Sequence, residues 1–172
     1  YGDLVMKTYK TSIMNNWFTV KVKYTKQLDN GALKRVTEQH LFASMTHTDA
    51  EARAHEELGQ MIRGDFNVIG ISPAKIHDIF AYDDSDIYYK CKVKYEKFGE
   101  VTETTKSVTQ TMLVSANNVK EAYERMQESL SGLMADFEIP SIVVSPIVEI
   151  FPYKEELDKE LSRRPIEEVE QD

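Results

Sequence analysis

The sequence predicts an α+β fold built from two similar halves in tandem. The first observation is a repeat: a shift of 71 positions places FTVKVKYTK (18–26) on YKCKVKYEK (89–97) and IHDIFAY (76–82) on IVEIFPY (147–153). The second is that strand-like alternation gives way to helical spacing at corresponding places in both copies. Two copies indicate an internal duplication and not a solenoid array. We expect each half to contain a β-hairpin, a helix and then one or two strands.

Each half begins with a predicted hairpin. Phe18, Val20 and Val22 alternate with polar residues, which is the period of a half-buried strand. Asn30-Gly31 then supplies the positive φ that a tight turn needs, and a second strand returns over roughly residues 34–45. The corresponding segments of the second half are a strand at 89–96, a turn around 98–100 and a strand that ends in TMLVSA.

A helix follows the hairpin in both halves. Thr48 precedes Glu51, and Asn118 precedes Glu121, at the spacing of a capping box or a close variant of it. Apolar residues then recur three and four positions apart, which is typical of one buried helix face. The two stripes are Ala50, Ala54, Leu58, Met61 and Ile62 in the first half, and Val119, Ala122, Met126, Leu130 and Leu133 in the second.

The segments after the helices are extended and contain prolines. Pro73, Pro140 and Pro146 cannot donate a hydrogen bond to a strand ladder. Each segment is therefore predicted to form two short strands with a break between them, or to lie at a sheet edge.

The lengths favour one domain over two. A unit of about 65 residues buries only about 60% of its unfolded surface, whereas one of about 150 residues buries nearer 70%. Only the three residues DSD at 84–86 separate the halves. We therefore expect one pseudo-twofold domain whose halves share a sheet or a core between helices and sheet. The predicted boundaries are 1–15 for an N-terminal extension, 16–154 for the domain with halves 16–83 and 87–154, and 155–172 for a short helix and acidic tail.

Composition indicates an ordinary soluble protein. The formal net charge is −8, and 41% of residues are hydrophobic and 29% charged. No run of about 18 apolar residues and no signal-peptide pattern is present, so we expect a cytoplasmic protein without a membrane segment. Cys91 is the only cysteine, which excludes an internal disulfide, and alternation places it on the apolar side of its strand.

Three stretches of the sequence carry a family resemblance. They are MNNWFTVKVKYTKQLDNGALKRVTE, LVSANNVKEAYER and DFEIPSIVVSPIVEIFPY. Over residues 14–153 the chain resembles an uncharacterised domain family of gut anaerobic bacteria and their phages and mobile elements. The resemblance implies a phage or mobile-element setting and supplies no catalytic residues.

The sequence contains no recognisable catalytic or cofactor motif. A phosphate-binding glycine loop, a nucleophile elbow and an HExxH pair are all missing. Glu51 and His55 are four residues apart on one helix face, but the pair lacks a third ligand for a metal. We therefore expect no metal and no cofactor, and an enzyme is not the favoured interpretation.

Asp78 and Glu149 are carboxylates in otherwise apolar predicted strands. Alternation places each of them on the same side as large apolar residues. In one interpretation the two meet near the pseudo-twofold axis, where repulsion raises one pKa and creates an acid–base pair. In the favoured interpretation each is an inward charge that prevents unwanted pairing of an edge strand.

The two hairpins are basic although the chain is acidic. Residues 17–38 hold five Lys or Arg against two acidic residues, and residues 88–109 hold five against three. Aromatic residues beside strand lysines are typical of sheets that bind single-stranded nucleic acid, whereas lysines on a solvent face also serve solubility. The candidate anion-binding residues are Lys21, Lys23, Lys92, Lys94, Trp17 and Tyr88.

These observations favour a non-catalytic module that binds a protein partner or assembles with itself. Unpaired sheet edges, or the contact between the halves, would provide the surface. The alternative is binding of a short single-stranded nucleic acid or a nucleotide through the basic hairpins.

Overall fold

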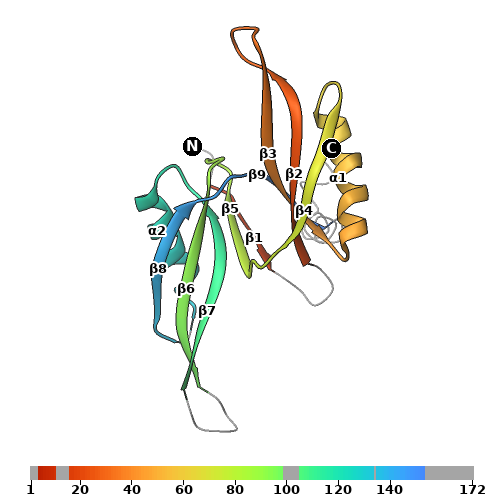
Figure 1. The fold of residues 1–172 in the computed structure, drawn as a ribbon. Helices are drawn as coiled ribbons and strands as arrows, with labels where there is room; N and C mark the ends of the chain where they lie inside the picture. The colour runs from red at the N-terminus through yellow and green to blue at the C-terminus, as the bar shows by residue number, and fades with distance from the viewer. Residues whose placement is uncertain (1–3, 11–15, 99–104, 134, 154–172) are drawn as a thin grey trace, which may run out of the picture.

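The computed structural model describes residues 4–10, 16–98, 105–133 and 135–153 (Figure 1). These residues form two helices and nine strands in two sheets, which is a mixed α/β fold. The predicted C-terminal helix and acidic tail lie outside the described residues. Part of the predicted N-terminal extension is described, and it forms a strand, β1 (Met6–Lys10).

The element order within each half follows the prediction. The first half contains β2 (Asn16–Gln27), β3 (Leu33–Ser44), α1 (His47–Met61), β4 (Phe66–Ala74) and β5 (Asp78–Tyr82). The second half contains β6 (Tyr88–Phe98), β7 (Thr105–Ser115), α2 (Val119–Ser129), β8 (Phe137–Val144) and β9 (Ile147–Phe151). Gly31 in the β2–β3 loop has a φ of 84°, as the predicted turn requires.

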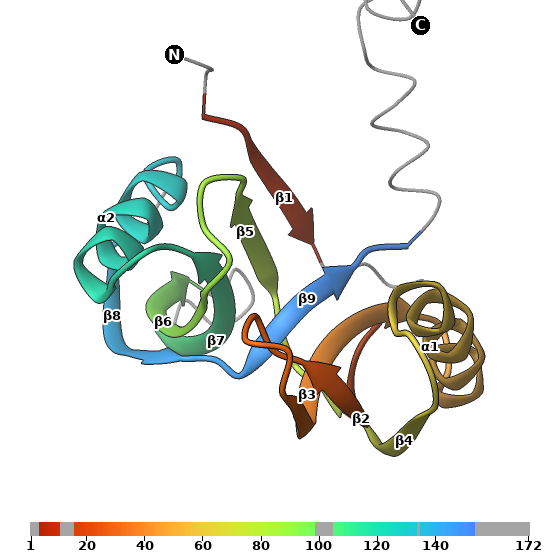
Figure 2. The same ribbon diagram turned by 90° about the horizontal axis from the view of Figure 1, so that it is seen from above.

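The last strand of each half lies in the sheet of the other half. The four-stranded sheet has the order β4-β2-β3-β9, and the five-stranded sheet has the order β1-β5-β7-β6-β8. β5 pairs with β7 in parallel, with Asp78 opposite Met112. β9 pairs with β3 in parallel, with Glu149 opposite His40. Figures 1 and 2 show these two strands passing between the sheets. The sequence did not predict this exchange.

The prolines lie in edge strands or between two strands. Pro73 is in β4 and Pro140 is in β8, and both strands are sheet edges, as predicted. Pro146 lies between β8 and β9, at the break where the chain crosses to the other sheet. Because proline lacks an N–H group, an edge or a break is where it costs no ladder hydrogen bond.

Each helix covers the outer face of one sheet (Figure 2). α2 begins as predicted, with the Asn118 side chain accepting a hydrogen bond from the backbone N of Glu121 at 2.8 Å. The prediction for α1 was wrong: its N-cap is Thr46, whose hydroxyl accepts from the backbone N of Asp49 at 3.1 Å, and not Thr48. Thr46 has the same three-residue spacing to an acidic residue, so the helix begins one half-turn earlier.

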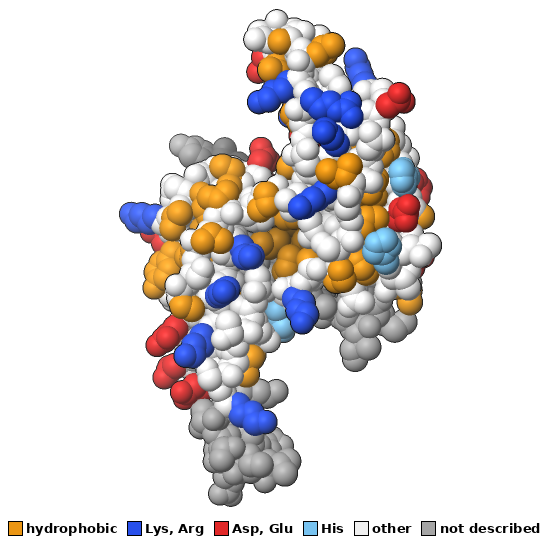
Figure 3. Space-filling model, in the orientation of Figure 1, with side chains coloured by type: hydrophobic (Ala, Val, Ile, Leu, Met, Phe, Trp, Pro, Cys, Tyr) orange, Lys and Arg blue, Asp and Glu red, His pale blue; other side chains and the backbone are white. Residues whose placement is uncertain are grey.

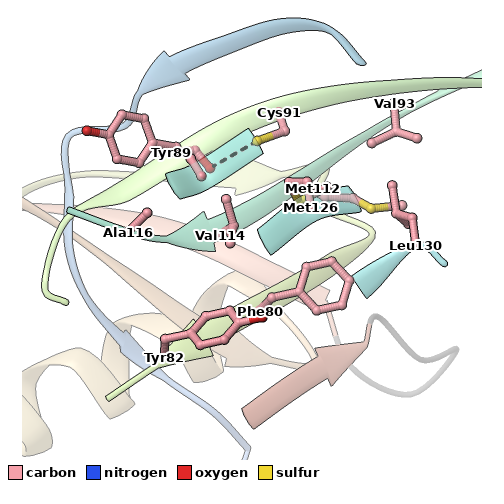
Figure 4. Close-up of a cluster of buried hydrophobic side chains, with 11 residues drawn as sticks. Phe80, Tyr82, Tyr89, Cys91, Val93, Met112, Val114, Ala116, Met126 and Leu130 are labelled. Carbon is pink, nitrogen blue, oxygen red and sulfur yellow. Dashed lines mark hydrogen bonds between the residues drawn. The ribbon is translucent and has the colours of Figure 1, made fainter. Parts of the chain in front are cut away.

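The buried side chains form three clusters. The cluster under α2 includes Cys91 and is drawn in Figure 4. The cluster under α1 contains Val20, Val22 and Phe42 together with Ala54, Leu58 and Phe151. The third lies between the sheets and draws on β1 and both halves: Tyr9, Trp17, Leu41, Ala43, Ile79, Leu113 and Ile147. Both outer clusters include residues of the exchanged strands, so the exchange is part of the packing.

Candidate functional site

Exposed lysines stand on the faces of both sheets that are opposite the helices. In β2, Val22 is buried towards α1, so its neighbours Lys21 and Lys23 project from the other face and are exposed. In β6, Val93 is buried towards α2, and Lys92 and Lys94 are exposed in the same way. Figure 3 shows Lys and Arg side chains in a band that runs over both hairpins. We call the strand lysines the lysine face: Lys21, Lys23, Lys90, Lys92 and Lys94.

A cleft lies between the two halves of the lysine face. It has a volume of about 330 Å³, and its lining combines Lys75, Lys90 and the polar side chains of Thr19, Gln39, Thr111 and Ser145 with apolar residues, which are Ala74, Ile76, Leu113, Pro146 and Ile147. Lys75 belongs to the crossover between β4 and β5, which also borders a more apolar cavity of about 670 Å³. The cleft therefore joins the two lysine rows with hydrogen-bonding groups of the kind that contact phosphate.

The two aromatic candidates are part of the core. Trp17 is only 3% exposed, and its ring meets that of Tyr9 edge-on at 6.5 Å between centroids. Tyr88 is half-buried against the same cluster, and burial raises its pKa, with Glu149 and Asp86 adding to the effect. A nucleobase could not stack on Trp17 in this structure.

Asp78 and Glu149 lie in different sheets, and each has its own neighbouring side chains. Asp78 is buried, and its Oδ1 lies 3.2 Å from Nδ1 of His77. Glu149 faces α1, where burial and the carboxylates of Glu38 and Glu57 raise its pKa.

Glu51 and His55 lie on α1, and both side chains are exposed. The His55 ring lies 5.7 Å from that of Phe66. Among the described residues, no group of three or more His, Cys, Asp or Glu side chains could hold a metal ion.

A polar group that the sequence analysis did not assign lies under the C-terminal end of α1. Tyr24 donates a hydrogen bond from its hydroxyl to Oε1 of Glu38 at 2.9 Å, and Lys26 Nζ lies 3.7 Å from the same oxygen. Nε2 of His40 is 3.6 Å from the other carboxylate oxygen. Burial raises the pKa of Tyr24 to about 12, with the Glu38 hydrogen bond adding to it. Burial also lowers the pKa of His40, although Glu38 opposes this, so the imidazole is neutral at pH 7.

Residues 16–153 match the sequence model of a family described as a domain of unknown function, DUF4494. The chain belongs to this family. The DUF4494 match begins at the first residue of β2 and ends two residues after β9, so it includes both halves and leaves β1 outside. It agrees closely with the extent of the resemblance found in the sequence. Comparison with curated proteins finds no match, and comparison with solved structures finds none either.

One further property of the DUF4494 domain concerns membranes. In the part of the chain that the structure describes, neither helix has the length and apolar character needed to span a bilayer.

Two arginines of the DUF4494 domain link the helices to the exchanged strands. Arg125 donates hydrogen bonds from Nη1 to the carbonyl oxygen of Ser115 at 2.9 Å and from Nη2 to Oδ2 of Asp84 at 2.6 Å. Its guanidinium also lies 4.1 Å from the ring centroid of Tyr82, at the end of β5. Arg125 therefore holds the end of β5 against β7 and α2.

Arg53 makes the corresponding contacts in the other half. It donates to the carbonyl oxygen of Ala43 at 2.7 Å, to that of Phe151 at 3.3 Å and to that of Pro152. Ala43 lies opposite Trp17 in the first hairpin, as Ser115 lies opposite Tyr88 in the second. The 71-position shift hid this pair because the hairpin of the second half is one residue longer, which makes the shift 72 in β7 and α2. A realigned repeat would have placed Arg53 on Arg125.

Proposed function

We propose that this DUF4494 domain is a non-catalytic binding module that holds a short single-stranded nucleic acid by its phosphates. The observation that carries the proposal is that both lysine rows are exposed on helix-free faces and are joined by the cleft containing Lys75 and Lys90. An extended polyanion could follow this line from one hairpin to the other.

The net charge of −8 does not oppose such binding at the lysine face. Exposed charges are screened over about 8 Å at physiological salt, so a bound phosphate responds mainly to nearby groups. Among the described strand residues, the acidic ones on the same face are Glu96, two positions after Lys94 in β6, and Glu138, opposite Lys94 in β8. They lie at the outer end of the second row, so the central lysines form the stronger part of the surface.

The buried position of Trp17 determines the expected mode of binding. Without stacking on that ring, affinity comes from phosphate contacts, which carry little sequence information. The binding should therefore be strongly salt-dependent and nearly independent of base sequence.

Fluorescence anisotropy with a labelled thymidine oligonucleotide tests the proposal. The logarithm of the binding constant should fall with the logarithm of salt concentration at a slope of about −0.7 per phosphate contact. A Lys92→Gln/Lys94→Gln variant should weaken binding and reduce the slope. Lys120→Gln, on an 86% exposed side chain of α2, is the matched control and should change neither. Absence of binding at low salt, or equal affinities for the two variants, would reject the proposal.

A second candidate function is assembly through exposed apolar residues along edge strand β8 and at the β8–β9 crossover. Val143 and Val144, on edge strand β8, are 48% and 61% exposed, and Ile87 and Val148 are also exposed. Exposed apolar residues at a sheet edge favour a protein partner or a second copy of the chain. Light scattering across a range of concentrations checks self-association, and a constant monomeric mass counts against it.

The proposal includes an origin by tandem duplication. It is supported by the matching element orders and by the equivalent registers of the two exchanged strands. It also includes a setting in gut anaerobes and their phages or mobile elements, which the sequence resemblance supports, and a cytoplasmic location, which the composition and the sequence pattern support.

A further inference from the structure

A cavity of about 520 Å³ opens between the β2–β3 hairpin and the C-terminal end of α1. This volume is within the range of about 300–1,000 Å³ that is typical of small-molecule sites. Its lining combines apolar and polar residues. The apolar residues are Leu33, Leu58, Met61 and Ile62, and the main polar ones are Tyr24, Lys26, Glu38, His40 and Arg63.

His40 is a buried polar residue in the lining of this cavity. It is 3% exposed, and neither ring nitrogen has a hydrogen-bond partner among the described residues. Its Nε2 is 3.6 Å from Glu38, which is beyond hydrogen-bonding distance. A neutral imidazole offers one donor and one acceptor, and leaving both unused in a protein interior is unfavourable.

The charges of the cavity favour an anion at its mouth. The Glu38 carboxylate accepts a hydrogen bond from the Tyr24 hydroxyl and forms an ion pair with Lys26. Arg63, by contrast, has no ion-pair partner within the described part of the chain. Glu149 lies opposite His40 in β9, and burial together with Glu38 and Glu57 already raises its pKa, so a further negative charge beside His40 is unfavourable. A ligand that fits has its anionic group at Arg63 and an uncharged polar group at His40.

The second half shows that the fold does not require these polar residues. Glu38 pairs with Val22 and His40 with Val20, whereas the corresponding partners of Val93 and Cys91 are Gln110 and Met112. Met112 is part of the apolar cluster under α2. The Glu38–His40 pair is therefore a local feature of the first half, placed at the open cavity.

We propose that this cavity binds a small organic acid that carries a second, uncharged polar group. The acid group pairs with Arg63, the apolar body lies against Leu58 and Met61, and the second group forms a hydrogen bond with His40. This site is separate from the lysine face, because Lys21, Lys23, Lys92 and Lys94 do not line it.

Titrations monitored by NMR of the histidine ring nitrogens test the site. The probes are 4-hydroxyphenylacetate, phenylacetate, which lacks the hydroxyl, and tyramine, which replaces the acid by an ammonium group. The His40 signal is identified by its loss in His40→Met. We expect 4-hydroxyphenylacetate to shift this signal with a dissociation constant of about 1 mM or below, and to bind more tightly than the other two.

Two variants make the test specific. Arg63→Gln should weaken binding of 4-hydroxyphenylacetate about tenfold, because it removes a charge-assisted hydrogen bond. Arg35→Gln removes an exposed cation of the β2–β3 hairpin that does not line the cavity, and it should leave binding unchanged. In His40→Met the histidine signal is absent, so isothermal titration calorimetry measures binding there, and the preference for 4-hydroxyphenylacetate over phenylacetate should disappear. The site assignment is overturned if no probe shifts the His40 signal, if tyramine binds as tightly as the acid, or if the two arginine variants behave alike.

Discussion

Nε2 of His40 lies 3.6 Å from Oε2 of Glu38 on the α1 side of the four-stranded sheet. At the corresponding place under α2 the chain has Met112 and Gln110. One half thus has a titratable pair where the other half has two residues that do not titrate, and the two layers should respond differently to pH.

Acidification should destabilise the protein through His40. Burial lowers the pKa of His40 in the folded state, whereas the unfolded value is about 6.5. Below about pH 6.5 the unfolded chain therefore binds the proton first, and the free energy of unfolding falls until the pH reaches the folded pKa. The free energy of unfolding, measured by urea denaturation at several pH values between about 5 and 7.5, should change less with pH in His40→Met than in the wild type. An equal pH dependence in both proteins would contradict this role of His40.

Glu149→Gln should stabilise the protein at neutral pH. Burial and the neighbouring carboxylates of Glu38 and Glu57 raise the pKa of Glu149, so its charged form is disfavoured in the folded state. The gain in the free energy of unfolding should be largest above the pKa of Glu149 in the folded protein. It should vanish as the pH falls below the pKa of glutamate in the unfolded chain, which is about 4.3. Thermal unfolding at several pH values measures it. Glu128→Gln, an exposed carboxylate of α2, should give no comparable gain.

Arg125→Met should destabilise the protein by about 2 kcal/mol, because it leaves the buried carbonyl oxygen of Ser115 without its charged donor. Arg125→Lys should recover only part of the loss, since an ammonium group cannot replace the planar, two-armed contact. Urea denaturation gives both values. Arg63→Gln is the control, and its effect should stay within about 0.5 kcal/mol. A loss in Arg125→Met no larger than that of the control would show that Arg125 does not hold β5.

Thr46→Ala should cost about 1 kcal/mol of stability, because it removes the hydroxyl that accepts the N–H of Asp49. Thr48→Ala should be close to neutral, since Thr48 is inside the first turn and its side chain is exposed. Urea denaturation of the two variants compares the observed N-cap with the one predicted from the sequence. A larger effect for Thr48→Ala would place the helix start later than the structure does.

Local features of the fold were predictable because they depend on local sequence. Alternation around Val20 and Val22 predicted a strand, and Gly31 predicted the turn after it. Pro73 and Pro140 predicted either a break between two short strands or a sheet edge, and both lie in edge strands. Hydrophobic alternation specifies which face of a strand is buried, but not the sheet that the strand joins, so the exchange of β5 and β9 could not be predicted.

The candidate sites were predictable only in part. The exposed lysines followed from strand alternation, but Trp17, at a strand start beside polar residues, turned out to be buried between the sheets. Glu38 and His40 looked like ordinary polar positions, because their burial depends on α1 and on β9, which is more than 100 positions away in the chain. The arginine pair was within reach of sequence reasoning, since only a one-residue difference in hairpin length concealed it.

The exchange of β5 and β9 has a consequence for biosynthesis. A ribosome delivers the chain from its N-terminus, so β3 emerges long before Ile147 and waits for its parallel neighbour until nearly all of the described residues have been translated. Throughout that interval the nascent first half presents an open strand edge, which is a recognised starting point for misassembly. Fragments that stop before Ile147 should therefore be poor folders, and maturation of the first half is tied to completion of the second.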